Sequence, residues 1–148
     1  MNIVGRKAII SNVKDNHIDF SSIDLDTVVI FDSNFSSLTA PDIQYIDISN
    51  SNFGILKNIN KAEYIILTNC AIFMIDGKSM KNVISLHIEY SNISYIKNFE
   101  LIGSNRADLK TIIYIDKSQS YLHEIFRGRF NFIYIETYID LINHLYKI

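Results

Sequence analysis

Histidine, cysteine and carboxylate side chains could perform acid–base, nucleophilic or metal chemistry, but their spacing in this chain disfavours most of it. The four histidines lie far apart, at His17, His87, His123 and His144, and neither an HxxxH nor a CxxC pattern is present. A zinc site is therefore not expected. His87, with Glu89 two residues further on, is the one candidate for acid–base work, and an interface role is the simpler interpretation of this pair.

The other sequence patterns of enzymes and cofactor sites are missing as well. Cys70 is the single cysteine, which excludes an intramolecular disulfide framework, and its place in an apolar segment predicts a buried thiol. No GxxxxGK[ST] or GxGxxG pattern is present, so nucleotide binding has no support. We therefore expect no cofactor, no metal, no catalytic residue and no small-molecule substrate, with an enzyme using His87 and Glu89 as the weakest alternative.

Tyrosine and carboxylate residues recur instead at alternate positions of short apolar segments. Tyrosine offers a large contact area with a polar tip, which suits protein recognition. Tyr45 is expected beside Tyr64, and Tyr114 beside Tyr134. The candidate partner-binding residues are Tyr45, Asp47, Tyr64, His87, Glu89, Tyr90, Tyr114, Asp116, Tyr134 and Glu136.

The segments that carry these residues repeat along the chain. Four of them, which begin at Leu25, Ile43, Ala62 and Val83, share one pattern of apolar positions. Their second apolar residues are Val28, Ile46, Ile65 and Leu86, at spacings of 18, 19 and 21 residues. Two weaker copies contain Ile113 with Ile115, and Ile133 with Ile135. A nearly constant period of this size is typical of a solenoid.

In each copy, apolar residues that alternate with polar ones predict a short strand. Stacked copies would pair as a parallel sheet, with their apolar residues in one shared core. About 10 residues remain for each return path, which is too short for a crossover helix. We therefore expect loops, turns or 3₁₀ pieces there, and a helical turn or protruding loop in the longer connection at residues 98–108.

The repeat resembles the short form of the leucine-rich repeat over about residues 25–137. Ile, Val and Phe stand where that family often has Leu, and the family's ladder position holds Ser33, Ser51, Cys70 and Ser91. The resemblance implies a curved parallel sheet whose concave side binds a ligand.

The expected fold class is thus a β-rich solenoid (α/β) in a single domain with capped ends. Residues 1–24 predict an N-terminal β-hairpin cap with its turn at residues 14–16, and residues 25–137 carry the repeats. Residues 138–148 predict a C-terminal capping helix, because apolar residues recur there at helical spacing. A second short helix is expected from Ser118, with Tyr121, Leu122 and Ile125 packed on the convex side.

Composition and charge limit the class of partner. The 148 residues have a net charge of −2 and a pI of about 6.0, which argues against direct nucleic-acid binding. No apolar run reaches the roughly 18 residues of a membrane span, so no membrane contact is expected. The N-terminal residues show no secretory signal, which makes a cytoplasmic protein the default expectation.

Carboxylates predicted on the inner face, with most basic residues in the return segments, favour a basic protein partner. A small acidic solenoid is similar to bacterial immunity proteins, so a toxin inhibitor or antitoxin is the first functional hypothesis, with a basic nuclease toxin as its partner. This analogy rests on size, charge and architecture alone. The alternative is an adaptor, or a host-interaction repeat protein of the phage or effector type.

Overall fold

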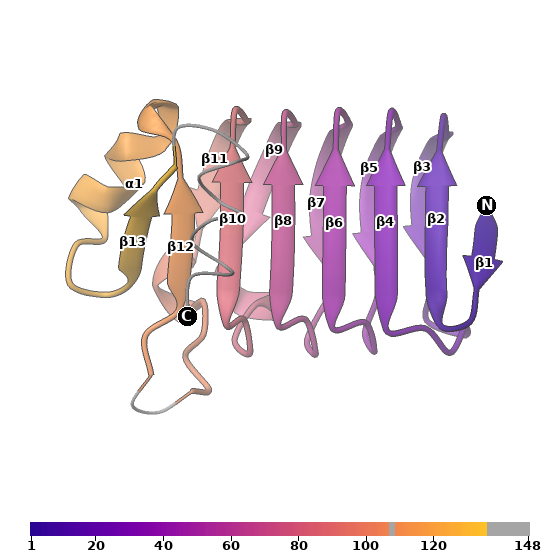
Figure 1. Cartoon of the computed structure of the whole chain (residues 1–148), viewed down its shortest axis with the longest axis horizontal. Helices are drawn as coiled ribbons and strands as arrows, with labels where there is room; N and C mark the ends of the chain where they lie inside the picture. Colours follow the sequence, from indigo (N-terminus) through magenta and orange to yellow (C-terminus); the bar gives the residue numbers. More distant parts are fainter. Residues whose placement is uncertain (107–108, 136–148) are drawn as a thin grey trace.

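The computed structural model describes residues 1–106 and 109–135, and there two β-sheets enclose one core (Figure 1). The first sheet contains, in order, β1 (Asn2–Val4), β2 (Lys7–Ser11), β4 (Thr27–Phe31), β6 (Tyr45–Ser49), β8 (Tyr64–Thr68), β10 (Ser85–Glu89), β12 (Ile112–Ile115) and β13 (Asn131–Tyr134). The second contains β11 (Asn92–Lys97), β9 (Ala71–Asp76), β7 (Asn52–Lys57), β5 (Asn34–Thr39) and β3 (Lys14–Asp19). The chain therefore winds as a β-solenoid, and each regular coil gives one strand to each sheet.

The repeat alignment predicted from the sequence is confirmed by the strand register. In the first sheet, Val28 pairs with Ile46, Ile46 with Ile65, and Ile65 with Leu86. These four side chains are fully buried. Burial of one such side chain contributes about 1.5–3 kcal/mol, and no coil can achieve it without a neighbouring coil.

The return segments are strands, and the sequence-based prediction of loops, turns or 3₁₀ pieces was wrong for them. Each regular coil turns at a tight corner and runs back through the second sheet, as β4 does into β5 and β6 into β7. The second sheet pairs its strands in parallel, as the first does beyond β1. The single curved sheet expected from the leucine-rich resemblance is thus replaced by two sheets.

The second sheet buries its apolar residues at a spacing of three. Phe35 and Leu38 of β5 are buried, as are the equivalent residues of β7 and β9. The pairing of β5 with β7 is interrupted at Ser36 and Gly54, and a Cβ on Gly54 would collide with the Ser36 carbonyl oxygen. In β9 and β11 the two residues between these positions are not buried, at Phe73 with Met74 and at Ser94 with Tyr95.

The corners after the first-sheet strands combine two local devices. Their left-handed residues, with φ between 48° and 56°, are Asn12, Asp32, Asn50, Asn69 and Tyr90. Asn and Asp tolerate this conformation better than most residues. The residue after each corner builds a ladder. Ser33 Oγ accepts the Val13 N–H at 3.2 Å and donates to the Phe31 carbonyl at 3.0 Å. Ser51, Cys70 and Ser91 make related bonds, so the predicted ladder position is confirmed.

The N-terminal end differs from the predicted cap. The antiparallel pair is β1 with β2, joined through Gly5, which has a φ of 61°. The predicted turn at residues 14–16 lies inside β3, and β2 and β3 belong to different sheets. Residues 7–19 therefore form the first coil of the solenoid, and β1 alone covers the edge of β2.

The C-terminal part contains short helices. The long connection contains the 3₁₀ helix η2 (Phe99–Leu101), as its length predicted, and η1 (Gly77–Ser79) follows β9. After β12 come η3 (Lys117–Gln119) and α1 (Ser120–Ile125), which confirms the short helix predicted from Ser118. Leu122 is buried as expected, but Ile125 is 68% exposed. The predicted capping helix at 138–148 lies outside the described residues.

Two side chains after β12 take the place of backbone groups that bond the corners of the regular coils. In the inner coils, the corner N–H groups of Asn50 and Asn69 donate to carbonyl groups of the next coil. At the last corner the Tyr90 N–H donates to Asp116 Oδ2 at 3.1 Å. Gln119 Nε2 donates to the Ser91 carbonyl at 2.6 Å. Asp116 and Gln119 therefore satisfy backbone groups that a further strand would otherwise pair.

In the described part of the chain the one α-helix, α1, has six residues, and no helix there is long and apolar enough to cross a membrane.

Replacing Ile65 by Asp should abolish folding or lower the free energy of unfolding by more than about 3 kcal/mol, because it places an unpaired charge in the core. Tyr64→Asp is the matched control, since the adjacent Tyr64 side chain points outward and is 42% exposed. Thermal denaturation followed by circular dichroism measures both. Equal melting temperatures for the two variants would contradict the strand register.

The Cys70 thiol should resist alkylation in the native protein. Burial raises its pKa from 9.0 to about 11, and the thiolate is the reactive form. At about pH 8 the thiolate fraction falls roughly hundredfold for such a shift, and burial limits access further. Iodoacetamide labelling followed by mass spectrometry should show slow modification in buffer and fast modification in concentrated urea. Similar rates in both would place Cys70 outside the corner ladder.

Candidate protein-binding surface

The outer face of the first sheet carries part of the predicted tyrosine and carboxylate set. Tyr45 and Tyr64 pair across β6 and β8 with ring centroids 6.4 Å apart, as the repeat predicts. Tyr64 is exposed, whereas Tyr45 and Asp47 are half-buried. Burial raises the pKa of the Asp47 carboxyl, and Lys7 opposes that shift. Tyr45, Asp47 and Tyr64 remain candidates for partner contact.

The middle of the predicted binding face is inaccessible. His87 and Glu89 of β10 are only 2% and 3% exposed, and Tyr114 of β12 is 4% exposed. His87 Nε2 lies 2.9 Å from Glu89 Oε2. Burial lowers the pKa of the His87 imidazole, although Glu89 and Asp116 act in the opposite direction. The expectation that these side chains face solvent or a partner was wrong, because they are enclosed and bonded within the chain.

Two further predicted residues lie at the last corner. Asp116 is buried, and its carboxylate accepts both the Tyr90 N–H and, at 2.7 Å, the Ser118 hydroxyl. It therefore holds the corner after β10 and does not display a charge to a partner. Tyr90 is 59% exposed and has a φ of 49°, at the corner position where the other coils have Asn or Asp.

The last strand is shifted by one residue relative to its predicted register. Phe132 pairs with Ile113 and Tyr134 with Ile115, so Ile133 and not Tyr134 lies beside Tyr114. A shift of one residue moves a side chain to the opposite face of a sheet. Tyr134 accordingly lies on the inner side, where its hydroxyl is 3.1 Å from His123 Nδ1. Glu136 lies outside the described residues.

The acidic wall predicted from the sequence is therefore not an accessible feature of the described part. Glu89 and Asp116 are buried, and Asp47 is half-buried. Alternation correctly placed most of these carboxylates on the outer face of the first sheet, but it does not report whether that face is covered.

The outer face of the second sheet presents a different surface, which the sequence analysis missed. Phe73 of β9 is 54% exposed and Tyr95 of β11 is 58% exposed, and their rings meet edge to face with centroids 5.1 Å apart. Ile55 and Met74 are half-exposed on the same outer face. We call these four residues, Ile55, Phe73, Met74 and Tyr95, the aromatic patch.

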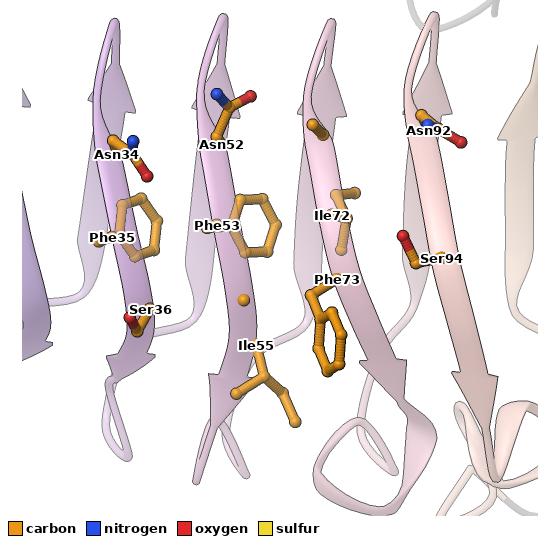
Figure 2. A pocket seen from close by; sticks show the side chains of 12 residues that line it. Asn34, Phe35, Ser36, Asn52, Phe53, Ile55, Ile72, Phe73, Asn92 and Ser94 are labelled. Carbon is orange, nitrogen blue, oxygen red and sulfur yellow. The ribbon is translucent and has the colours of Figure 1, made fainter.

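A shallow groove of about 560 Å³ adjoins the aromatic patch (Figure 2). Figure 2 shows Ile55 and Phe73 at its lower part and Asn34, Asn52 and Asn92 at its upper end. The stacked rings of Phe35 and Phe53, with centroids 5.3 Å apart, are buried and line it from the core side. The groove is thus apolar at one end and rich in amide groups at the other.

The pairing interruption described above forms this groove. Gly54 has no side chain, and small residues, Ser36 and Ser94, line the groove from β5 and β11. Phe73 lies at the side of this groove, where its ring is accessible to a partner. The rigid sheet beneath the patch holds its geometry before binding, which lowers the entropic cost of association.

Basic residues lie at the end of the same strands. Lys57 ends β7 and Lys97 ends β11, and both are exposed, as is Lys78 in η1. Asp76 is the carboxylate among them, and its Oδ1 accepts the Lys78 N–H at 3.0 Å and the Asn98 amide at 3.1 Å. The prediction that lysines concentrate in the return segments is confirmed for these positions.

A weak sequence signal for the second sheet was present. Buried apolar residues recur three apart in the return segments of β5, β7 and β9, as Phe53 with Leu56 and Ile72 with Ile75. Their period matches neither the alternation of a regular strand nor a full helical face. Comparison of the return segments with one another would have shown the repeat and its outward-facing residues.

Comparison with known proteins gives one distant similarity to report. No family model matches the chain, and no solved structure matches it. A curated protein named interferon antagonist OPG040, from vaccinia virus (strain Western Reserve), is 29% identical over 100 residues. The match covers 65% of this chain and 34% of the relative, so the chain spans about a third of the relative's length.

These findings correct the family resemblance. The chain shares apolar spacing with short leucine-rich repeats, but no family model supports membership, and the return segments form a second sheet. The analogy to bacterial immunity proteins is also wrong, because the relative found is a viral protein of a different kind. An apolar period of about twenty residues identifies a stacked coil and does not by itself identify a family.

Stability should fall as the pH drops through the titration range of unfolded histidine. Because burial lowers the pKa of His87 below 6.5 in the folded chain, the unfolded state takes up a proton first as the pH falls. His87→Gln should reduce the difference between urea midpoints measured at about pH 7.5 and about pH 5.5. An unchanged difference would mean that His87 is protonated equally in both states.

Proposed function

We propose that this chain is a non-enzymatic protein-binding module of the host-interaction type, and that the outer face of its second sheet contacts a host protein. The observation that carries the proposal is the aromatic patch. Two adjacent aromatic residues, each more than half exposed, rest on a rigid sheet beside a groove. Exposed apolar clusters of this kind mark interaction sites more often than bare surface does.

The chemistry of the patch suits protein recognition. Binding energy at protein interfaces concentrates in a few large side chains, with tyrosine prominent among them. Phe73 and Tyr95 can each insert an edge between partner side chains, and the asparagines at the upper end of the groove can pair with backbone amides. Ile55 and Met74 extend the apolar area on β7 and β9.

The distant relative supports the host-interaction part of the proposal. A protein named as an interferon antagonist acts on its host, and the similarity covers 65% of this chain. The toxin-inhibitor hypothesis has no corresponding support. It depended on exposed carboxylates, and two of them, Glu89 and Asp116, are buried. We therefore no longer favour the hypothesis that the first sheet binds a basic protein.

The enzyme alternative is disfavoured on physical grounds. Its two proposed groups, His87 and Glu89, are 2% and 3% exposed, so a substrate could not reach them without local opening. General acid–base catalysis requires hydrogen-bond reach to the reacting group. Their mutual bond at 2.9 Å satisfies the pair internally.

Photo-crosslinking in interferon-competent cells tests the proposal. With p-benzoylphenylalanine in place of Phe73, irradiation should produce one recurrent covalent adduct with a host protein. Ile125 is the matched control position, because it is an exposed apolar residue on α1 and belongs to neither sheet, and it should give no such adduct.

Crosslinking from a third position, Tyr64, tests the protein-binding function independently of the surface proposed for it. An adduct formed from Tyr64 and not from Phe73 would keep the protein-binding function and move its surface to the first sheet. The absence of a recurrent adduct from both Phe73 and Tyr64 would contradict the function itself.

A further inference from the structure

Two chemistries lie next to each other on the outer face of the second sheet. Lys57 follows Ile55 by two residues on β7, and Lys97 follows Tyr95 by two residues on β11. Residues two apart on a strand share a face and lie about 7 Å apart. Each apolar anchor at this end therefore has an ammonium group within the reach of one short peptide.

These cations are not committed to partners within the described chain. None of the ion pairs between described residues involves Lys57, Lys78 or Lys97. Asp76, the carboxylate among them, accepts two hydrogen bonds from neighbouring groups. Three ammonium groups against one bonded carboxylate leave this end of the sheet positive, although the chain as a whole has a net charge of −2.

From this juxtaposition we infer that the aromatic patch, together with Lys57 and Lys97 at the ends of β7 and β11, binds a short acidic segment of the partner protein, in which carboxylates flank large apolar side chains. The inference rests on the proposed function and specifies its partner. The apolar residues of the segment pack on Phe73 and Tyr95, and its carboxylates meet Lys57 and Lys97. The apolar contacts supply most of the affinity, and the exposed lysines select the sign of charge and speed the encounter.

The same surface suits nucleic acid and lipid less well. Phe73 and Tyr95 meet at an interplanar angle of 62°, so they do not form a parallel platform on which successive bases could stack. Ile55 and Met74 offer no stacking face. Three lysines are also fewer than the clusters of basic residues that bind anionic membranes.

Selection from a displayed library of random peptides on the immobilised full chain tests the inference. Enriched peptides should combine Asp or Glu with Phe, Trp, Leu or Ile. Binding of synthetic copies, measured by fluorescence anisotropy, should weaken at least about tenfold with Phe73→Ser. Affinity for these peptides should also fall as the salt concentration rises.

Charge reversal gives the sharper test. The double variant Lys57→Glu, Lys97→Glu should lose the acidic peptides and, in a new selection, enrich basic ones. Lys14→Glu is the matched control, because Lys14 is an exposed lysine on β3 of the same sheet, at the opposite edge from β11. It should leave peptide binding unchanged, and circular dichroism should show that all variants fold.

Three results would overturn the inference. The selection could enrich peptides without acidic residues, or it could enrich no peptide at all. The double variant could also bind the acidic peptides as tightly as the unmodified chain does. Binding of random single-stranded RNA or phosphatidylserine vesicles that is lost in the double variant would assign the surface to another ligand. If peptides fail while crosslinking from Phe73 persists, the inference falls and the proposed function stands. If neither Phe73 nor Tyr64 gives a recurrent adduct, the proposed function falls as well.

Discussion

The structure depends on the fact that no coil can satisfy its own backbone or bury its own apolar face. Neighbouring coils supply both, through parallel strand pairs on two sides and through the serine and cysteine ladder at the corners. This dependence has a consequence at the ends of the stack, where the next coil is missing. There β1 pairs antiparallel with β2, and at the other end the side chains of Asp116 and Gln119 stand in for backbone groups.

The sequence predicted the elements that follow a simple period. Alternation of apolar residues located the first-sheet strands, and the fixed spacing predicted their register through Val28, Ile46, Ile65 and Leu86. The second sheet was missed because its buried residues are three apart, which matches neither regular period. The shift of β13 was missed for a related reason. Residues 131–135 alternate two large apolar sets, so either Phe132 with Tyr134 or Ile133 with Ile135 can face the core.

The candidate site shows a different limit of sequence-based prediction. Alternation indicates which side chains leave the core of a sheet, but accessibility depends on what else packs on that face. His87 and Glu89 point away from the first-sheet core and are nevertheless buried. Phe73 and Tyr95, which occupy segments expected to be loops, are exposed on a flat and rigid strand surface. The proposed binding surface is therefore on the second sheet, whereas the sequence predicted it on the first.

The return segments are strands of a second, hydrogen-bonded sheet that carries the aromatic patch. Hydrogen–deuterium exchange with mass spectrometry on the free chain tests it most directly. Amides of β7 and β9 should be protected from exchange, as those of β6 and β8 are, because β7 pairs along its length with β5, and β9 with β11. Fast exchange across residues 52–57 and 71–76, with protection retained at 45–49 and 64–68, would contradict it.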